Sequence, residues 1–453
     1  MTVEALLAAI NADPADDAPR LVYADWLQQR GDPRGEWIAL ACRIARTDEL
    51  ADAWPALVRR ERRLWRRHGH EWLPRDDRTV RALERGFPSE VEAPASELAG
   101  LHARFPTATS VLLEGSPSTL IELDESGFNQ TWLHLRYAGT RWEPADLFAA
   151  IGRSDAPTSL PSTPAVADGL LLHGSRYRDR TIVRPTPMMF GLRRLHLGTV
   201  RFAQLEGPDT AFAQLEEASI SSSTIDVASW ILAGATPGTP RAVAIRGIAI
   251  APHHPVLAVP ALRDVTRLDL PGAGIGREGL ARVLAASASV EELDLSNCNI
   301  DGAGVELLAR WPGAARLRRL DLSHNWIGAR GAAALATGFP SLIGLRLRAC
   351  SLGDRGAVEL VRGDLLRRLV VLQIDRNSFA SALAALMPMF GPRLLHLEIR
   401  NNPFDVDSIA ALVEAPADFD PLELRTSLRV SAIGKRYRAL PVRTGSGVEP
   451  WPD

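Results

Sequence analysis

Apolar residues recur at a fixed spacing from Val265 to Phe404, and this pattern dominates the chain. Within a frame of eleven residues, positions 1, 4, 6 and 11 are apolar, and the frame opens at Val265, Val290, Leu317, Leu342, Leu369 and Leu394. Successive frames begin 25, 27, 25, 27 and 25 residues apart. A period of this length predicts a solenoid, in which each repeat forms one coil of a continuous stack.

Each repeat predicts one short strand followed by one helix. Positions 4 and 6 of the frame are two residues apart, so their side chains point to the same side of a strand, toward the core. The next segment has helical spacing, because Ala332, Leu335 and Ala336 fall on one face. Neither element can bury its apolar side alone, so each coil requires a neighbour and the core runs along the stack.

Position 9 of the frame is expected at the corner where the strand ends. A small side chain that bonds buried backbone groups is needed there, because an unpaired buried amide is costly. The position is occupied by Ala273, Cys298, Asn325, Cys350, Asn377 and Asn402.

The clearest copy, Leu317–Ile327, reads LRRLDLSHNWI and resembles the leucine-rich repeat, LxxLxLxxNxI. The half that follows, IGxxGAxxLA at Ile327–Ala336, is similar to the ribonuclease-inhibitor-like class, in which a helix backs each strand. The resemblance implies an α/β fold. We expect a leucine-rich-repeat solenoid with a curved parallel sheet on the concave side and helices on the convex side, preceded by a small N-terminal α-helical domain.

Regular repeats cover residues 265–418, and the frame is degenerate over residues 85–264. Short strands are expected at Phe87–Val91, Ser110–Leu113, Trp132–Leu135 and Leu170–Leu172, a helix at Ala95–Arg104, frames at Leu192, Leu215 and Pro240, and a weak strand at Leu422–Leu424. The Pro-, Ser- and Thr-rich segment Asp155–Gly169 predicts a loop expelled from the stack. The solenoid is thus expected over residues 85–428, with a cap and tail at 429–453.

Residues 1–84 predict a separate helical domain. Helical periodicity runs through Val3–Asn11, Pro19–Arg30 and Glu36–Arg46. The string DPADDAPRLVYADWLQQRGDPRGEWIAL resembles the repeat-companion domain that precedes repeat arrays in large bacterial paralogue families. That family is known by sequence and not by activity, so the resemblance implies architecture and little chemistry.

The residues that carry this second resemblance favour a structural role over a catalytic one. We expect Leu21, Trp26 and Trp37 to form a miniature core. Buried tryptophans need polar partners at their edges, which gives the nearby charges a structural role. Charged residues would then cap helices and form ion pairs around it, namely Asp16, Asp17, Asp25, Arg20 and Arg34.

A further helix is expected over Leu57–His68, and it carries six arginines. An inner face is formed by Leu57, Glu61, Leu64 and Trp65, and the arginines cover most of the remainder. A phosphate-binding patch is one interpretation. A solvated face, whose arginine stems shield the apolar seam, is favoured, because no aromatic stacking platform accompanies the charges.

Composition narrows the function classes. The chain has 453 residues and a formal net charge of −2, whereas general nucleic-acid binders are usually basic. No apolar run approaches the length of a membrane span, and the N-terminus lacks the basic region of a secretory signal. Three cysteines in a chain of this length indicate a reducing compartment, so we expect a cytoplasmic protein. Lys435 is the single lysine, which suggests an arginine-biased bacterial source.

Catalytic and ligand motifs are weak. The sequence Gly274–Gly279 follows the GxGxxG pattern, with Asp294 further on, as in a dinucleotide fingerprint. Yet the same glycine spacing recurs at Gly328 and Gly331, so helix packing common to several coils explains it better. The histidine pairs lack companions at metal-ligand spacing, and Cys298 and Cys350 are too far apart for a disulfide. We expect no catalytic residue, cofactor or metal, and a small-molecule ligand is disfavoured.

The outward strand positions carry charges of both signs and form the candidate binding surface. Cross-strand ion pairs that keep the sheet soluble are one interpretation, and a patterned protein-binding face is the other. Trp326 is expected at the rim of that face, next to Arg346 and Arg348, as a binding hot spot or a packed side chain. The candidate partner-binding set is Arg267, Asp269, Glu292, Asp294, Arg319, Asp321, Trp326, Arg346, Arg348, Asp375, Arg376, His396, Glu398 and Arg400.

The sequence therefore predicts a non-enzymatic scaffold or adaptor that binds a partner protein on the concave face. Three alternatives remain open. The first is a stoichiometric inhibitor or regulatory subunit of a partner enzyme. The second is an enzyme with its chemistry in residues 1–84. The third is a component or protease target of a bacterial signalling or defence system. In the last case, the Asp155–Gly169 loop would be the place for a cut.

Overall fold

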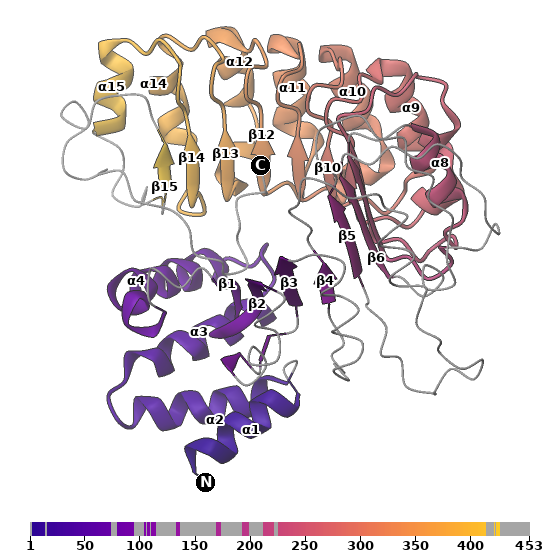
Figure 1. Ribbon diagram of the computed structural model, residues 1–453. Helices are drawn as coiled ribbons and strands as arrows, with labels where there is room; N and C mark the ends of the chain where they lie inside the picture. Colours follow the sequence, from indigo (N-terminus) through magenta and orange to yellow (C-terminus); the bar gives the residue numbers. More distant parts are fainter. Residues whose placement is uncertain are drawn as a thin grey trace. The chain divides into compact units, whose positions relative to one another are not determined.

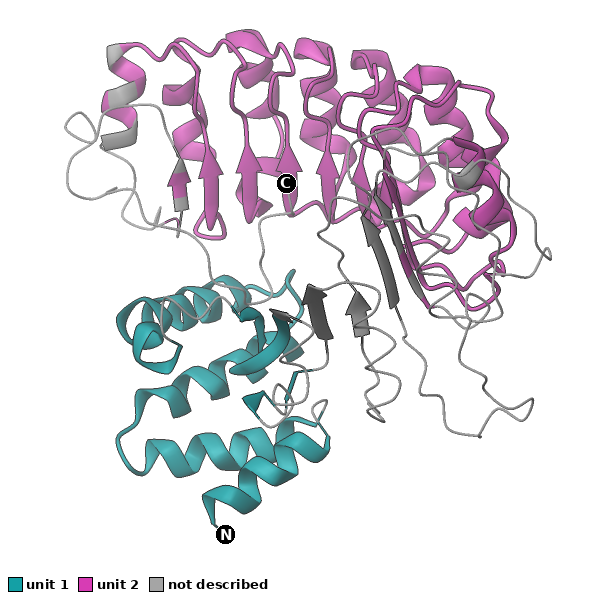
Figure 2. Ribbon diagram, viewed as in Figure 1, with its two compact units in different colours: residues 1–179, 443–453 teal, residues 180–442 magenta. Residues whose placement is uncertain are grey.

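The computed structural model describes residues 2–13, 16–73, 79–94, 104–105, 107–108, 110–114, 133–135, 169–173, 193–198, 212–221, 225–413, 421 and 423–425. The chain divides into two compact units (Figure 2). Unit 1 comprises residues 1–179 and 443–453, and unit 2 comprises residues 180–442.

Unit 1 begins with the helices that the sequence predicts: α1 (Val3–Ala12), α2 (Asp17–Gln28), α3 (Pro33–Arg46) and α4 (Trp54–Trp72). Side chains fix where two of them start. The carboxylate of Asp16 accepts the amide of Ala18 at 2.9 Å, and that of Asp32 accepts the amide of Arg34 at 2.8 Å. These caps satisfy amides that a helix N-terminus leaves unpaired, so α2 and α3 each begin a few residues earlier than their apolar periodicity indicates.

The core of unit 1 centres on Trp37, which is buried on α3. Its indole Nε1 donates to the carboxylate of Glu61 at 2.5 Å, and Glu61 is itself buried on α4. The rings of Trp65 and Trp72 lie 4.9 and 5.0 Å from that of Trp37. The expected core is therefore confirmed at Trp37, whereas Leu21 and Trp26 are partly buried at its edge.

Asp17 forms ion pairs beside this core, as expected, but with arginines other than the expected Arg20 and Arg34. Asp17 on α2 is buried and binds Arg46 at 2.6 Å and Arg85 at 3.3 Å. Arg20 is also buried and donates to the backbone oxygen of Asp16 at 2.9 Å. Burial lowers the pKa of Arg20. These contacts tie α2 to α3 and to the turn at residue 85.

Short strands follow the helices: β1 (Val80–Glu84), β2 (Phe87–Pro94), β3 (Ser110–Glu114) and β4 (Leu133–Leu135) form one sheet in that order, and β5 (Gly169–His173) follows. Strands β1 and β2 form an antiparallel hairpin that the sequence did not reveal, and β2, β3 and β4 pair in parallel. Phe87 packs into the helical core. Apart from Arg104, the expected helix at Ala95–Arg104 lies outside the described residues, as do the Asp155–Gly169 loop except for Gly169 and the expected cap at 429–453.

Unit 2 contains the strand series that the repeat predicts. Consecutive strands pair in parallel and lie side by side in chain order (Figure 1): β6 (Arg194–Gly198), β7 (Glu217–Ser221), β8 (Ala242–Arg246), β9 (Arg267–Asp269), β10 (Glu292–Asp294), β11 (Arg319–Asp321), β12 (Gly344–Arg346), β13 (Val371–Gln373), β14 (His396–Glu398) and β15 (Glu423–Arg425). The register from β9 to β14 joins position 4 of each frame to position 4 of the next, from Leu268 to Leu397. The predicted six-frame alignment is therefore confirmed.

Helices back these strands on one side of the sheet (Figure 1): α8 (Ile225–Ala233), α9 (Gly276–Ala286), α10 (Gly302–Arg310), α11 (Gly328–Gly338), α12 (Gly353–Leu360), α13 (Leu365–Arg368), α14 (Ala382–Leu386) and α15 (Val406–Val413). Short 3-10 turns lie at Pro255–Ala258, Pro260–Leu262, Pro312–Ala315 and Met387–Met389. Frame positions 1, 4, 6 and 11 are buried from Val265 to Ile399 and form one apolar layer between strands and helices.

Position 9 forms the backbone-bonding ladder expected at the strand corners. Oδ1 of Asn325 accepts the amides of Cys298 and Ile300 in the preceding coil at 3.1 and 2.8 Å. Its Nδ2 donates to the carbonyl oxygens of Leu295 and Leu322 at 2.8 and 2.9 Å. Asn377 and Asn402 repeat this arrangement with the coils before them. Each asparagine therefore satisfies buried backbone groups of two coils at once.

Candidate functional site

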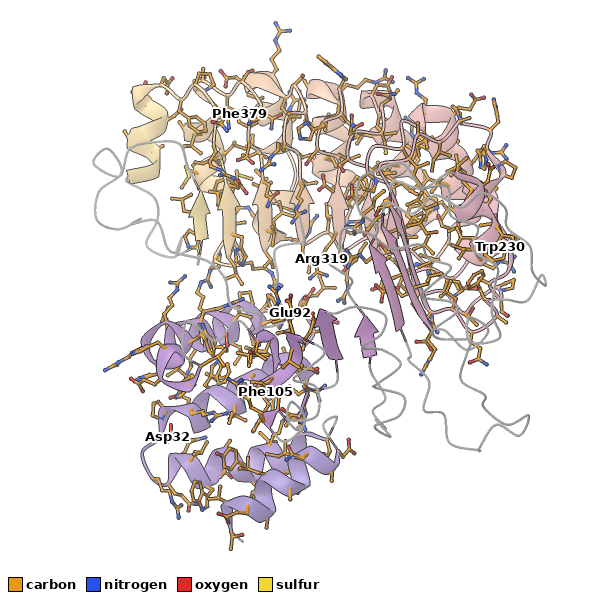
Figure 3. All side chains as sticks on the ribbon, in the orientation of Figure 1. Asp32, Glu92, Phe105, Trp230, Arg319 and Phe379 are labelled. Atoms are coloured by element: carbon orange, nitrogen blue, oxygen red, sulfur yellow. The ribbon has the colours of Figure 1, made fainter. Side chains whose placement is uncertain are left out.

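The strand side chains that point away from the helices form what we call the sheet face, made of frame positions 3, 5, 7 and 8 on β8–β14. Parallel register aligns these positions into rows across neighbouring strands, about 5 Å apart. Arg319, labelled in Figure 3, is the first residue of β11 and occupies position 3. Within each row, side chains on adjacent coils are therefore close enough to bond.

Position 5 presents a row of carboxylates on three successive strands. Asp269 is buried and bonds both Arg246, at 2.9 Å, and Arg267, at 3.1 Å. Asp321 is buried at the other end of the row and lies 3.6 Å from Arg346, which is buried too. Both outer carboxylates are thus neutralised by arginines.

Asp294 is the middle member of the row, and it lies in register with both Asp269 and Asp321. Its Oδ1 accepts the backbone amide of Ser296 at 2.8 Å. Among the described residues, no basic side chain forms an ion pair with Asp294. Burial, reinforced by the neighbouring Asp321, raises the pKa of Asp294 to about 6.

Position 3 alternates in sign on the same strands and is half-buried. Arg319 lies 2.6 Å from Glu292, and Arg267 lies 3.9 Å from the same carboxylate. These pairs cross from coil to coil, as the solubility interpretation expects. Exposed pairs of this kind contribute well under about 1 kcal/mol each, so the row shapes the potential of the face more than its stability.

The second half of the face places carboxylates beneath arginines. Asp375 is 2% exposed as a side chain, while its partner Arg348, 3.2 Å away, is 36% exposed. Glu398 is 5% exposed and is bonded by Arg348 at 3.5 Å and by Arg400, which is 41% exposed. Burial, followed by the charge of Glu398, raises the pKa of Asp375. Guanidinium groups therefore form the outer layer over β12–β14.

Burial sorts the fourteen candidate residues into three groups. Five are buried beneath the surface of the free protein: Asp269, Asp321, Arg346, Asp375 and Glu398. Seven are half-buried: Arg267, Glu292, Asp294, Arg319, Arg348, His396 and Arg400. The two exposed ones are Arg376 and Trp326.

Trp326 is 78% exposed, the highest value among the exposed large apolar side chains of the described residues. Its amide donates to the backbone oxygen of Ile300 at 3.1 Å, which places it on the rim beyond the end of β11. Within the part of the chain that the structure describes, no ring stacks on the indole and no guanidinium lies over it. The packing alternative for Trp326 is therefore disfavoured, and so is the expected contact with Arg346, which is buried against Asp321.

The GxGxxG motif is built for packing. Gly276 has a φ of 61°, and its amide donates to the oxygen of Cys298 in the next coil at 2.9 Å. A side chain at Gly279 would come within 2.7 Å of Ile275, which is buried. Equivalent contacts occur at Gly331 and Gly356. The amide that a phosphate would need is thus already bonded within the solenoid.

Metal and thiol chemistry find little support in the described residues. No group of three or more His, Cys, Asp or Glu side chains there could hold a metal ion. Cys298 and Cys350 are free and buried, and their thiols donate to carbonyl oxygens of the preceding coils at 2.9 and 3.0 Å. Burial raises the pKa of both thiols to about 12, which keeps them protonated and unreactive.

The arginines of α4 flank the apolar face that the sequence predicts. Leu57 and Glu61 are buried, while Arg60 is exposed and lies 2.5 Å from Glu36 on α3. The helix N-terminus has no side-chain cap.

Among described residues, no helix is long and apolar enough to cross a membrane.

Arg246, which neutralises Asp269 from β8, was not among the predicted residues. The signal was present, because Arg246 is position 7 of the frame that opens at Pro240. Ser296 and Ser323 were not predicted either; their amides bond Asp294 and Asp321 two residues before them. Those short backbone bonds depend on the turn after each strand and have no sequence pattern of their own.

Comparison with known proteins identifies the repeat. Residues 286–309 and 316–336 match the family described as Leucine Rich repeat. No curated protein is significantly similar in sequence. Among solved structures, a chain in the crystal structure of the Rad7 and Elc1 complex in yeast is 11% identical with a TM-score of 0.41, covering 95% of this chain and 99% of that chain.

A chain of the TLR13–ssRNA13 complex is 14% identical with a TM-score of 0.40, covering 65% of this chain and 44% of that chain. Both scores are low, so we infer nothing about function from either likeness. The matched repeats lie in the regular part of the sheet, on β10 and β11 with their helices. The chain thus contains leucine-rich repeats and has an α/β solenoid fold, in which a parallel sheet is backed by helices.

Proposed function

We propose that the protein is a non-enzymatic scaffold or adaptor that binds a partner protein on the sheet face of its solenoid. One observation carries this proposal: the sheet face presents ordered charges along consecutive strands and ends in an indole that is 78% exposed. A charge pattern of this kind sets partner choice and encounter rate, and an exposed tryptophan is the side chain most enriched at binding hot spots. The fold itself assigns no function.

Ordering of the face supports binding of a folded surface. The buried carboxylates hold their arginines through ion pairs, as Asp375 does for Arg348 at 3.2 Å. Arginines fixed in this way lose less side-chain freedom on association, which lowers the entropic cost of binding. The proposed binding residues are therefore the accessible members of the candidate set, with the buried ones as their supports.

Capture from a lysate of the source cells, using charge-reversal variants, tests this proposal. Arg319→Glu reverses a half-buried charge on the sheet face, and Arg355→Glu is the matched change at an exposed position on α12, on the helix side. We expect Arg319→Glu to lose the proteins that wild type and Arg355→Glu both retain. Retention by Arg319→Glu together with loss by Arg355→Glu would place binding on the helices.

The same captured protein separates an adaptor from a stoichiometric inhibitor or regulatory subunit. If the partner is an enzyme whose activity changes when the chain is added at a one-to-one ratio, the result supports an inhibitor or regulatory subunit. Unchanged activity supports the adaptor. A protease-target role concerns the loop at 155–169 and is tested by incubating the full chain with source-cell lysate and sequencing any fragment. The companion-like helices of unit 1 are proposed to have a structural role.

A further inference from the structure

The rim at the ends of β11–β14 differs in charge from the rest of the sheet face. We call this region the arginine rim, made of Trp326, Arg348, Arg376 and Arg400. Its three arginines stand against two carboxylates, Asp375 and Glu398, which are 2% and 5% exposed. The rim therefore carries one excess positive charge, and all the charge that reaches solvent there is cationic.

Arg376 is the arginine that supplies this excess. It is exposed, and among the described residues it forms no ion pair. Its backbone amide donates to the oxygen of Arg400 at 3.1 Å, and the amide of Ala349 donates to the oxygen of Asp375 at 2.9 Å. These bonds place Arg376 between the coils that carry Arg348 and Arg400, about 5 Å from each backbone.

The backbone of Arg376 favours other residues at that position. Its φ is 54°, in the left-handed region that glycine and asparagine adopt most readily. Equivalent positions in the other regular coils are occupied by Gly272, Asn297, His324, Ala349 and Asn401, so three of the five are glycine or asparagine. An arginine there costs backbone energy and gains no ion pair with the described residues in return. A carboxylate of a partner is therefore the group that its charge fits.

Trp326 is unusual at its own frame position. Position 10 of the other regular coils carries the smaller side chains of Gly274, Asn299, Ser351, Ser378 and Pro403. The indole is 78% exposed and so contributes little to packing. Its coil lies two coils before that of Arg376, which corresponds to about 10 Å across the strands. An apolar anchor and a cation at this separation fit a few residues of one extended segment.

We propose that the arginine rim docks an acidic segment of the partner protein, with an apolar side chain of that segment on Trp326 and a carboxylate on Arg376. This inference rests on the proposed function, since it names the chemistry of the partner that the sheet face binds. Arg348 and Arg400 lie in the coils on either side of Arg376 and add their guanidinium groups to the positive surface around it. Carboxylate–guanidinium pairs beside an aromatic anchor are a recurrent pattern of interface hot spots.

Nucleic acid is the main competing occupant, and the charge distribution disfavours it. Nucleic-acid binding draws on many arginines and lysines that neutralise phosphates, and on aromatic platforms for stacked bases. On the rim, Arg348 and Arg400 already form ion pairs with carboxylates, which largely neutralise their charges. The whole chain has a formal net charge of −2. One exposed indole and one excess cation suit a short acidic peptide better.

Peptide selection on the full chain tests this inference. A display library of random peptides, about 12 residues long and thus able to reach about 40 Å, is selected on wild type alone, and the selected peptides are then measured on the double variant Trp326→Ala/Arg376→Asn. Asparagine keeps the left-handed backbone accessible at position 376. The matched control is Val358→Ala/Arg355→Ala, because both residues are exposed on α12.

We expect the selected peptides to combine acidic residues with an apolar one. The leading peptide should bind wild type and the α12 control equally and bind the rim variant about tenfold more weakly or worse. Added salt should weaken binding to wild type. Selection of neutral or basic peptides, or equal binding to the rim variant, would overturn the inference. Tighter binding of a single-stranded RNA of similar length, also lost in the rim variant, would replace the acidic peptide with nucleic acid.

A third variant separates failure of this inference from failure of the proposed function. If the selected peptides lose binding to Arg319→Glu and keep it to the rim variant, the sheet face binds protein elsewhere and only the inference fails. If no selected peptide depends on Arg319 or on the rim, both proposals fail. Circular dichroism of every variant checks that the solenoid is intact.

Discussion

Single side chains on the sheet face differ more in burial than in chemistry. Asp269 and Asp321 are paired with arginines, whereas Asp294 between them is bonded by Ser296 and forms no ion pair with a described residue. Its pKa is raised to about 6 because burial and a neighbouring carboxylate both disfavour the charged form. A half-buried carboxylate that pairs with no cation among the described residues therefore destabilises the folded state at neutral pH.

Asp294→Asn should therefore stabilise the solenoid. The folded state holds the Asp294 proton more tightly than the unfolded state, so wild-type stability falls as pH rises from about 4 to about 6. The gain of the variant should be near zero at pH 4 and reach roughly 1–3 kcal/mol at pH 7. Urea unfolding of both proteins at the two pH values measures it, with Glu292→Gln as the control that breaks an ion pair instead. A variant less stable than wild type at pH 7 would show that Asp294 has a cationic partner.

At the scale of the repeat, the asparagines at frame position 9 hold each coil to the one before it. Oδ1 of Asn377 accepts the amide of Cys350 at 2.9 Å, and its Nδ2 donates to the oxygen of Leu347 at 2.6 Å. Cys350 occupies the same frame position one coil earlier, and its thiol donates only weak bonds to backbone oxygens, at 3.0 Å to that of Leu322. The two residues therefore fill similar space and satisfy different numbers of backbone groups.

Asn377→Ala should be more damaging than Cys350→Ala. The asparagine change leaves buried amides and carbonyl oxygens without partners, at about 1–3 kcal/mol for each group. The cysteine change removes one weak donor and a small volume. Urea midpoints of the two variants, followed by far-ultraviolet circular dichroism, make the comparison. Equal losses would mean that packing volume, and not hydrogen bonding, fixes the corner.

Strand and helix positions in the regular coils were predictable from the sequence, because the apolar period and the strand period coincide. Strand β1 was not, since Val80–Glu84 has no apolar alternation and is defined by its pairing with β2. Direction away from the helices was also predictable for Asp375 and Arg348. Their burial was not, because the longer arginine extends over the carboxylate only when the two strands are side by side. The exposure of Trp326 likewise depends on the turn after β11.

On the scale of the molecule, the described residues of each unit have their own hydrophobic core. Trp37 and Glu61 lie in the core of unit 1, and Asn377 belongs to unit 2. Repeat arrays are stabilised by contacts between neighbouring coils, and a separate core can unfold independently of them. We therefore do not expect a single unfolding transition for the whole chain.

Glu61→Ala should lower only the transition of unit 1. The change leaves the indole N–H of Trp37 buried without its acceptor, at a cost of about 1–3 kcal/mol, whereas Glu61→Gln keeps an oxygen acceptor and should cost less. Unit 2 also contains Trp230, Trp311 and Trp326, so the measurement is made in a background in which these three are replaced by Phe. Tryptophan fluorescence then follows unit 1, and circular dichroism follows both units during urea unfolding. A single transition that Glu61→Ala and Asn377→Ala both shift would show that the two units unfold together.

Site-specific photo-crosslinking tests the central claim, that the sheet face binds a partner protein, most directly. Amine-reactive reagents are unsuitable because Lys435 is the only lysine, so a benzophenone amino acid is placed at His396 on the sheet face or Trp326 on its rim, and at Arg355 or Val358 on α12. After irradiation in source-cell lysate, we predict discrete adducts of one partner from His396 and Trp326 and none from α12. Adducts from the α12 positions alone, or none from any position, would contradict the account.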